Sequence, residues 1–199
     1  MPTQTHAQKL ATRFAKLGYN DIASASRHAV KRLLLDYLGV ALAGSQSESG
    51  HIARRFAREQ GGKSGAQLIG DNAKSSMATT AFANAISSHS IELDDIDVLA
   101  LFHFSPPVYS SALAAADASK ANGKQLLMAL AAGCEMMERA SRAANNSLRN
   151  RSFHTTPTCG VFGAAIAASK ILRLNADKMT HALGMAGAQA SGLMEMYGP

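Results

Sequence analysis

The sequence contains no tryptophan, only two cysteines and few aromatic residues of any kind. Aromatic residues make up 6% of the chain, whereas hydrophobic residues, many of them alanine, make up 47%. This composition favours closely packed helices over an aromatic-rich β structure. Cys134 and Cys159 both lie in apolar, alanine- and glycine-rich surroundings. We therefore expect buried free thiols in a reducing compartment and no disulfide framework.

Long hydrophobic runs are also absent. No uninterrupted apolar stretch approaches the roughly 20 residues that a membrane-spanning helix needs. The first residues, Met1–His6, contain no apolar core of a signal peptide. These two absences predict a cytoplasmic protein with no membrane partner.

Positive charge is in modest excess. Lysine and arginine total 20 against 14 acidic residues, which gives a formal net charge of +6. The basic residues are scattered and are not interleaved with aromatic residues, so we expect no nucleic-acid partner. The excess is compatible with a small anionic substrate. At 199 residues the chain has the length of one domain and can bury a substantial core.

Hydrophobic periodicity predicts an all-α fold of about eight helices. The third of these helices is basic and is expected to be exposed, and residues 66–70 form the one short strand-like piece. Ser24 or Ser26 can cap the second helix and Asn175 the last one. Recurring glycine and alanine residues predict short distances between helices. The predicted helices span residues 4–18, 24–43, 50–60, 75–89, 107–121, 124–144, 157–173 and 176–192.

The segment 151–163 is the most informative stretch. It begins as a polar loop with one histidine and turns directly into a helix of small residues. Thr155 or Thr156 can cap this helix, and Pro157 suits its first turn because proline has no N–H to leave unpaired there. His154 is therefore expected just before the positive end of a buried helix, where an anion is favoured.

Two interpretations of His154 remain open from the residues alone. A lone histidine is more often structural than catalytic. Alternatively, Arg149 and Arg151, which precede it, hold a substrate carboxylate while the imidazole moves a proton. A nearby helix N-terminus favours neutral imidazole, which is the form that a base requires.

A second constellation combines two histidines with four carboxylates: His89, Glu92, Asp94, Asp95, Asp97 and His103. Carboxylates this dense repel one another, so some are expected to be exposed, paired or shifted in pKa. The alternatives are a solvated loop, a metal site of aspartate and histidine ligands, or a magnesium-binding DDxD motif of prenyl-diphosphate enzymes. The DDxD interpretation needs a second acidic motif, which the sequence lacks.

Cys159 is a weaker candidate. A cysteine near a helix N-terminus can be a nucleophile. Its position one turn inside a glycine- and alanine-rich helix favours buried packing instead.

Three blocks of the sequence resemble signatures of the MmgE/PrpD family. Residues 153–170, FHTTPTCGVFGAAIAASK, resemble the family's FHPTGTCGAFGAAAAAA. Residues 89–95, HSIELDD, resemble HALDFDDT, and residues 182–193, ALGMAGAQASGL, resemble ALGIAGSQASGL. The order and spacing of the blocks also agree, and the resemblance covers nearly the whole chain.

The resemblance implies which residues form the site. The family's active-site acidic residue, threonine and two histidines match Glu92, Ile96, His103 and His154 by position. Ile96 departs from the family pattern, because it cannot hydrogen-bond to a substrate. We assign catalytic roles to His154, His103, Glu92, Asp94 and Asp95, the carboxylates orienting a histidine, and substrate binding to Arg149, Arg151 and His89, with no metal.

The resemblance also implies an activity. Family members named for 2-methylcitrate dehydration, cis-aconitate decarboxylation and iminodisuccinate epimerisation all handle a proton next to a carboxylate in a small polyacid. We expect lyase or isomerase chemistry of this kind on a di- or tricarboxylic acid. The resemblance requires no cofactor and implies a homodimer formed largely through the helical domain.

The end of the chain gives a second hypothesis. The family's pattern continues beyond the position of Pro199 with a basic segment and an α+β domain. Residues 1–199 are therefore expected to be the family's helical domain, truncated before that second domain. The alternative to catalysis is a catalytically incomplete remnant that acts only as a helical dimerisation scaffold.

Overall fold

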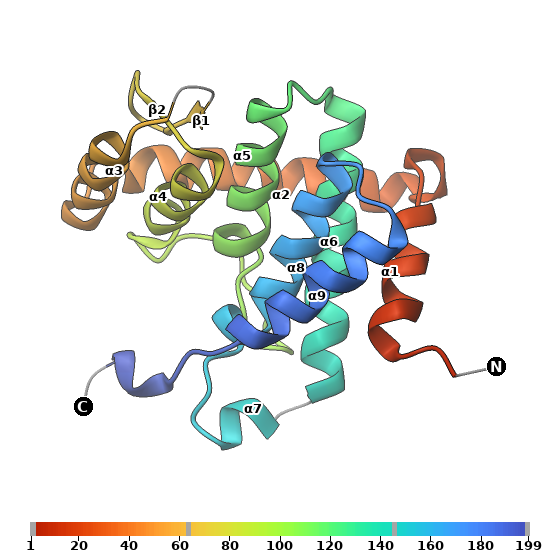
Figure 1. The fold of residues 1–199 in the computed structure, drawn as a ribbon. Coiled ribbons are helices and arrows are strands. Elements are labelled where there is room, and N and C mark those ends of the chain that lie inside the picture. The colour runs from red at the N-terminus through yellow and green to blue at the C-terminus, as the bar shows by residue number, and fades with distance from the viewer. Residues whose placement is uncertain (1–2, 63–64, 145–146, 198–199) are drawn as a thin grey trace.

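The computed structural model describes residues 3–62, 65–144 and 147–197, and within them it contains nine α-helices and one two-stranded sheet (Figure 1). The predicted all-α fold is confirmed. All eight predicted helices are present, and α7 adds a ninth of four residues. The helices are α1 (His6–Lys16), α2 (Ser24–Gly44), α3 (Glu48–Gln60), α4 (Met77–His89), α5 (Ser110–Ala118), α6 (Gly123–Ala144), α7 (Ser147–Asn150), α8 (Thr155–Ile171) and α9 (Ala176–Gln189).

The strands are much shorter than the helices. β1 (Ala66–Gln67) pairs antiparallel with β2 (Lys74–Ser75), and one π-helical turn (Ser105–Tyr109) leads into α5. The predicted strand is therefore confirmed only over its first two residues. Its partner was not predicted, because Ser75 was placed in the following helix.

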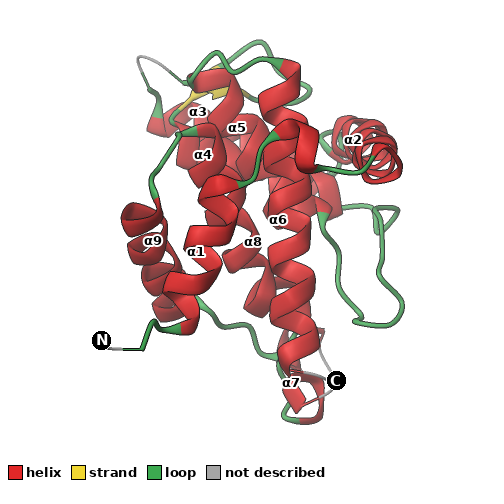
Figure 2. Cartoon of the chain, turned by 90° about the vertical axis from the view of Figure 1, so that its right-hand side faces the viewer, coloured by secondary structure: helices red, strands yellow, loops and turns green. Residues whose placement is uncertain are grey.

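The helices form two groups that share α5. In the first group, α8 packs against α6, α9 and α5, and α1 packs against α9. In the second group, α4 packs against α2, α3 and α5 (Figures 1 and 2). Since α5 contacts both α4 and α8, it joins the two groups into one core.

A pair of facing glycines sets the contact between α6 and α8. A Cβ atom on Gly163 would lie 2.8 Å from the carbonyl oxygen of Gly133, and one on Gly133 would lie 2.9 Å from that of Gly163. Side-chain carbons do not approach backbone oxygens this closely. The predicted short interhelical distance is thus confirmed here, and α8 can pack in the centre of its group because these two positions lack side chains.

A buried lysine fastens α1 to the end of α8. The ammonium group of Lys170 donates to the carbonyl oxygens of Phe14 at 2.8 Å, Ala15 at 3.3 Å and Leu17 at 2.7 Å. These carbonyls lie at the C-terminal end of α1, where helical carbonyls lack partners within the helix. Lys170 therefore supplies the hydrogen bonds that the end of α1 would otherwise lose on burial.

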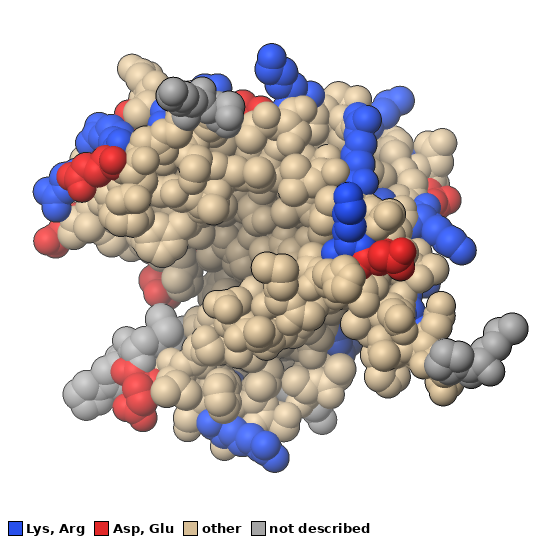
Figure 3. Space-filling view, viewed as in Figure 1, with Lys and Arg blue, Asp and Glu red and all other residues tan. Residues whose placement is uncertain are grey.

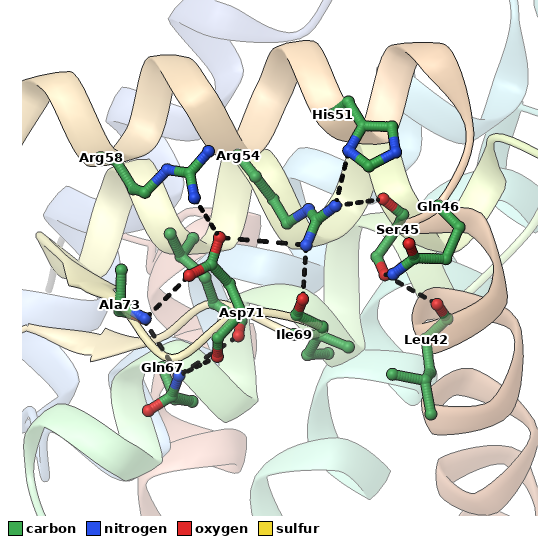
Figure 4. Close-up of polar contacts among 12 residues, drawn as sticks. Leu42, Ser45, Gln46, His51, Arg54, Arg58, Gln67, Ile69, Asp71 and Ala73 are labelled. Carbon is green, nitrogen blue, oxygen red and sulfur yellow. Dashed lines mark hydrogen bonds and ion pairs between the residues drawn. The ribbon is translucent and has the colours of Figure 1, made fainter.

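A second buried cation organises the other group (Figure 4). Arg54 in α3 is 7% exposed, and its guanidinium donates to the carbonyl oxygens of Ser45, at 2.7 Å, and Gly70. Arg58 donates to Asp71 Oδ2 at 2.9 Å. The prediction that this helix is simply basic and exposed is therefore wrong for Arg54. Its charge ties the end of α2 to the loop of the small hairpin.

The predicted helix caps are partly confirmed. The side chain of Asn175 accepts a hydrogen bond from Lys178 N at 2.9 Å at the start of α9, as predicted. At α2 the prediction is wrong. Ala23 is the N-cap and no side chain caps this helix, since Ser24 is already its first helical residue.

Charged side chains are distributed unevenly over the face of the molecule shown in Figure 3. On the face in Figure 3, lysine and arginine side chains lie mainly around the periphery, and the centre of that face carries no charged side chain. None of the helices in the described ranges combines the length and apolarity needed to cross a bilayer.

The glycine contact predicts a difference between two Gly→Ala substitutions. Gly163→Ala should lower the free energy of unfolding by about 1–3 kcal/mol, because the added methyl group overpacks the contact with α6. Gly184→Ala in α9 is the matched control, since a Cβ there meets nothing within 4 Å. It should be neutral or stabilise by up to about 1 kcal/mol, because alanine favours helix. Urea denaturation measures both, and equal effects would refute the close-contact explanation.

Candidate active site

Three segments that are distant in sequence meet around one pocket. The pocket has a volume of about 320 Å³ and is lined by Ile96, Leu101, His103, Arg149, His154 and Met194. These residues come from the loop after α4, from α7 and the residue before α8, and from the short 3-10 helix that follows α9. Of the predicted site residues, the structure brings His103, Arg149 and His154 together. Leu101 and Met194 were not predicted, because no sequence pattern marked them.

Two contacts hold the His103 segment against α8. The backbone N–H of His103 donates to Thr156 Oγ1 at 3.1 Å. Four residues after His103, Pro107 lies against α8 at Gly160, where a Cβ would come within 2.5 Å of the proline ring. The position of His103 relative to His154 therefore depends on a small residue and a hydroxyl in the first turns of α8. The contribution of Thr156 was missed, because its partner lies 53 residues away in sequence.

The carboxylate of Asp94 bridges two histidines. Its Oδ1 lies 2.9 Å from His89 Nδ1, and its Oδ2 lies 3.3 Å from His103 Nδ1. The two imidazole rings lie edge to face with centroids 4.8 Å apart. The side chain of Asp94 is 0% exposed, whereas those of His89 and His103 are 27% and 16% exposed. The single buried carboxylate of Asp94 therefore lies against two partly exposed imidazole rings.

This bridge shifts the pKa of all three groups. Burial by itself would raise the pKa of Asp94, but the hydrogen bonds with His103 and His89 outweigh burial and lower the pKa to about 2. The hydrogen bond to Asp94 raises the pKa of His89 and of His103, and burial opposes this only in part. His103 consequently holds a proton more readily than a free histidine does, and it does so at the wall of the pocket.

The neighbouring carboxylates, Asp95 and Glu92, contact other groups. Asp95 accepts hydrogen bonds from the backbone N–H groups of Phe104 at 2.9 Å and Ser105 at 3.0 Å, and from the Ser105 hydroxyl. It thereby fixes the backbone that follows His103. Glu92 is exposed, and its Oε1 lies 3.5 Å from His89 Nε2. Of the three carboxylates predicted to orient a histidine, only Asp94 reaches His103.

His154 is the N-cap residue of α8, and its backbone N–H donates to the carbonyl oxygen of Gly192 at 2.9 Å. No side chain caps α8, so the predicted capping by Thr155 or Thr156 is wrong. His154 is 6% exposed. Burial lowers its pKa below the ordinary value, and the positive charges of His103, His89 and Arg149 lower it further. This histidine therefore favours the neutral form, as predicted for a base.

The two predicted arginines differ in position. Both arginines are exposed, but Arg149 lines the pocket from α7 and Arg151 does not. Arg149 lies in α7, whereas Arg151 follows the end of that helix. Arg149 is therefore the candidate for binding a substrate anion.

The acidic block does not form a DDxD cluster. Asp94 contacts the two histidines and Asp95 binds the backbone after His103, while Asp97 accepts hydrogen bonds from Leu99 N and Ala100 N at 2.9 and 2.8 Å. The three carboxylates thus have separate partners. A cation would find its closest ligand set in Asp94 and the two histidines, whose ligand atoms lie within 4.8 Å of one another. Within this set Asp94 is hydrogen-bonded to His89, at 2.9 Å, and lies at ion-pair distance, 3.3 Å, from His103.

Cys159 is buried within α8, as predicted in preference to a nucleophilic role. It is 2% exposed. Burial raises the pKa of its thiol to about 11, so the nucleophilic thiolate is disfavoured.

The Asp94 bridge predicts how stability depends on pH. The lowered pKa of Asp94 contributes stability above its ordinary value of 3.8, which is lost as the pH falls through about 2. The raised pKa values of His89 and His103 contribute stability below 6.5, which is lost as the pH rises through those values. Asp94→Asn should therefore lower the free energy of unfolding most between about pH 4 and 6.5, by about 2–3 kcal/mol.

Denaturation at a series of pH values, together with NMR titration of the two rings, tests this expectation. Asp177→Asn is the control, because Asp177 lies exposed in the first turn of α9. It should cost no more than about 1 kcal/mol at any of these pH values. A cost for Asp94→Asn that does not vary with pH would contradict the charge bridge.

Comparison with known proteins gives a consistent result. Residues 8–198 match the MmgE/PrpD N-terminal domain. The chain is 32% identical to human cis-aconitate decarboxylase over 171 residues, which cover 82% of this chain and 35% of that protein. It is 30% identical to cis-aconitate decarboxylase of Aspergillus terreus over 194 residues, which cover 92% of this chain and 39% of that protein.

A third relative is the cis-aconitate decarboxylase-like protein oryM of Aspergillus oryzae, 30% identical over 183 residues, or 88% of this chain and 38% of that protein. The chain spans less than two-fifths of the length of these three relatives. The match over residues 8–198 nevertheless covers nearly all of this chain. The chain therefore belongs to the MmgE/PrpD family, and it corresponds to the family's N-terminal domain.

Proposed function

We propose that the whole protein is a lyase or isomerase that moves a proton next to a carboxylate in a small di- or tricarboxylic acid. The observation that carries this proposal is the pair of histidines on one pocket. His103 has a raised pKa and His154 a lowered one. Two titratable groups whose environments push their pKa values apart are suited to act as acid and base.

In this proposal His154 is the general base. Its neutral imidazole can accept a proton from the carbon next to the substrate carboxylate. His103, which Asp94 keeps more readily protonated, is the general acid that donates to the opposite end of the reacting group. A positioned acid or base contributes about 10²–10⁴-fold to a rate.

The substrate carboxylate is placed against Arg149. A guanidinium can bind a carboxylate through two parallel hydrogen bonds. The N-terminus of the 17-residue helix α8 begins beside the pocket, and its dipole favours the negative charge that develops during proton removal. The remaining assigned residues support His103: Asp94 orients its ring, Asp95 fixes its backbone, and His89, with Glu92 beside it, shares the charge of Asp94.

The names of the relatives give the first compound to test. Two of the relatives described above are cis-aconitate decarboxylases, so cis-aconitate is the first candidate substrate. The proposal concerns the whole protein, because the relatives are more than twice as long as the part that this chain matches. The chemistry uses side chains alone and calls for no organic cofactor.

The proposal predicts the effect of removing the base. His154→Ala should lower the exchange of the proton next to the carboxylate with solvent deuterium by about 10²–10⁴-fold, because it removes the imidazole that the proposal assigns as the base. Exchange into cis-aconitate and related di- and tricarboxylic acids can be followed by NMR or mass spectrometry. His181→Ala is the matched control, since His181 lies exposed on α9. It should leave exchange unchanged, and exchange that survives in His154→Ala would refute the assignment.

One observation favours a second function, that of a self-associating scaffold. Leu35, Leu38 and Leu42 of α2 are 75%, 41% and 56% exposed. Their spacing of three and four residues places them on one face of the helix. A row of exposed leucines of this kind is typical of an interaction surface. We infer that a second copy of the chain covers it, which gives a homodimer.

The leucine row predicts a change of oligomeric state. The protein should be a dimer at micromolar concentration, and the double substitution Leu35→Glu with Leu42→Glu should make it monomeric, because it places charges in an apolar contact. Size-exclusion chromatography with light scattering measures the mass of each. Leu172→Glu, at the C-cap of α8 and 42% exposed, is the control and should remain dimeric. A monomeric wild type would rule out the scaffold function.

A further inference from the structure

The chain carries two exposed apolar surfaces of complementary kinds, a ridge and a hollow. The ridge is the leucine row of α2, formed by Leu35, Leu38 and Leu42, and the hollow is a groove between α3 and α4. Resting on the self-association proposed above, we infer that the leucine row of one copy lies in the α3–α4 groove of a second copy. The second copy places its own row in the groove of the first, so the homodimer contains this contact twice.

The α3–α4 groove is built from apolar side chains of two helices that pack side by side (Figure 1). It has a volume of about 370 Å³ and is lined by Ser49, Ile52, Ala53 and Phe56 of α3 and by Phe82 and Ile86 of α4. None of these described lining residues is charged. Ile52, Phe56 and Phe82 are 52%, 44% and 54% exposed. Exposed apolar groups that adjoin one another in this way mark an interaction site.

The two walls of the groove are fixed within one copy. The rings of Phe56 and Phe82, one from each wall, meet edge to face with centroids 6.0 Å apart. Both helices also bond to residues 69–70 of the hairpin loop, where Arg54 of α3 donates to a carbonyl oxygen and Asn84 of α4 accepts from an N–H at 3.0 Å. A groove that is formed before binding costs little ordering when a partner enters it.

The leucine row has the spacing of a helix that binds in a groove. Leu35, Leu38 and Leu42 occupy positions i, i+3 and i+7 of α2, which is the anchor pattern of helix-in-groove recognition. In Figure 2, α2 is seen end-on at the edge of the molecule. Two rows packed against each other would leave both grooves uncovered, whereas a row in a groove covers both surfaces at once.

The charges beside the two surfaces are complementary. Lys31 precedes Leu35 by four residues and therefore lies on the same face of α2, at one end of the row. The α3 wall carries an acidic residue near each end, Glu48 and Glu59, with Arg55 between them, so it is negative overall. All four charged side chains are exposed. A lysine against this wall gives a charged pair at the rim of an apolar contact.

Both surfaces belong to neighbouring parts of the fold. α2 ends at Gly44, and the beginning of α3 packs closely on that end, since a Cβ on Gly50 would lie 2.9 Å from the Cα of Ser45. The groove therefore adjoins the C-terminal end of the helix that carries the row. A two-fold axis beside this end brings each row to the groove of the other copy, which makes the contact self-complementary.

Substitutions in the groove test the contact in the intact protein. Phe82→Lys should raise the dimer dissociation constant at least about thirtyfold, because it places a charge where the leucines bind. Ile52→Lys, on the other wall, should have the same effect, and circular dichroism identifies a variant that fails to fold. Met185→Lys is the matched control and should leave the constant unchanged, since Met185 is 72% exposed on α9 and does not line the groove. Light scattering over a dilution series measures each constant.

A mixture of two variants tests whether the row meets the groove. Leu35→Glu with Leu42→Glu damages the row and keeps the groove, whereas Phe82→Lys damages the groove and keeps the row. Each should be monomeric alone at a concentration where the wild type is dimeric. Their mixture should form a heterodimer, because one contact is then intact and the other brings glutamates to a lysine. Native mass spectrometry identifies the heterodimer by its mass.

The outcomes separate this inference from self-association itself. A heterodimer formed by two variants that are monomeric alone would support it. Folded Phe82→Lys and Ile52→Lys proteins that dimerise as tightly as the wild type would overturn it, and so would a mixture that stays monomeric. Self-association through the leucine row would survive both of those results. A monomeric wild type would overturn the inference and the proposed self-association together, and no result here bears on the proposed proton transfer.

Discussion

The absence of side chains on one face of α8 is the constraint on which the rest of the structure depends. Gly163 brings the backbone of α8 against Gly133 of α6, and one turn earlier Gly160 makes room for Pro107. The first contact places α8 at the centre of its group of helices. The second draws the segment that carries His103 onto the beginning of the same helix. Since His154 is the residue just before α8, one close-packed helix sets both the core and the separation of the two histidines.

The electrostatics of the site follow from what surrounds each histidine. His103 shares the buried carboxylate of Asp94, which favours its charged form. His154 is buried beside other positive groups, which favour its neutral form. The surroundings of the two histidines therefore shift the pKa values of identical side chains in opposite directions. The difference between the two pKa values is what suits the pair to act as acid and base in the proposed proton transfer.

Half of the pocket lining and the Asp94 bridge lie on the same loop. Residues 90–104 supply His103 and Asp94 as well as Ile96 and Leu101. Asp95 and Asp97 fix the loop through backbone hydrogen bonds and leave the pocket to other side chains. Carboxylates that look catalytic in sequence can therefore be structural in the fold, because a short irregular loop needs acceptors for its own N–H groups.

The sequence by itself was enough to predict the helices, the close packing of helices through small residues, and His103 and His154 as candidate site residues. Periodic apolar residues define helices locally, and the Asn175 cap depends on a contact three residues away. Only the tertiary structure decided that Asp94 and not Glu92 or Asp95 binds His103, that Arg149 and not Arg151 reaches the pocket, and that Thr156 holds His103 and does not cap α8. Such choices depend on loop conformation and on contacts between residues tens of positions apart, which no local pattern encodes.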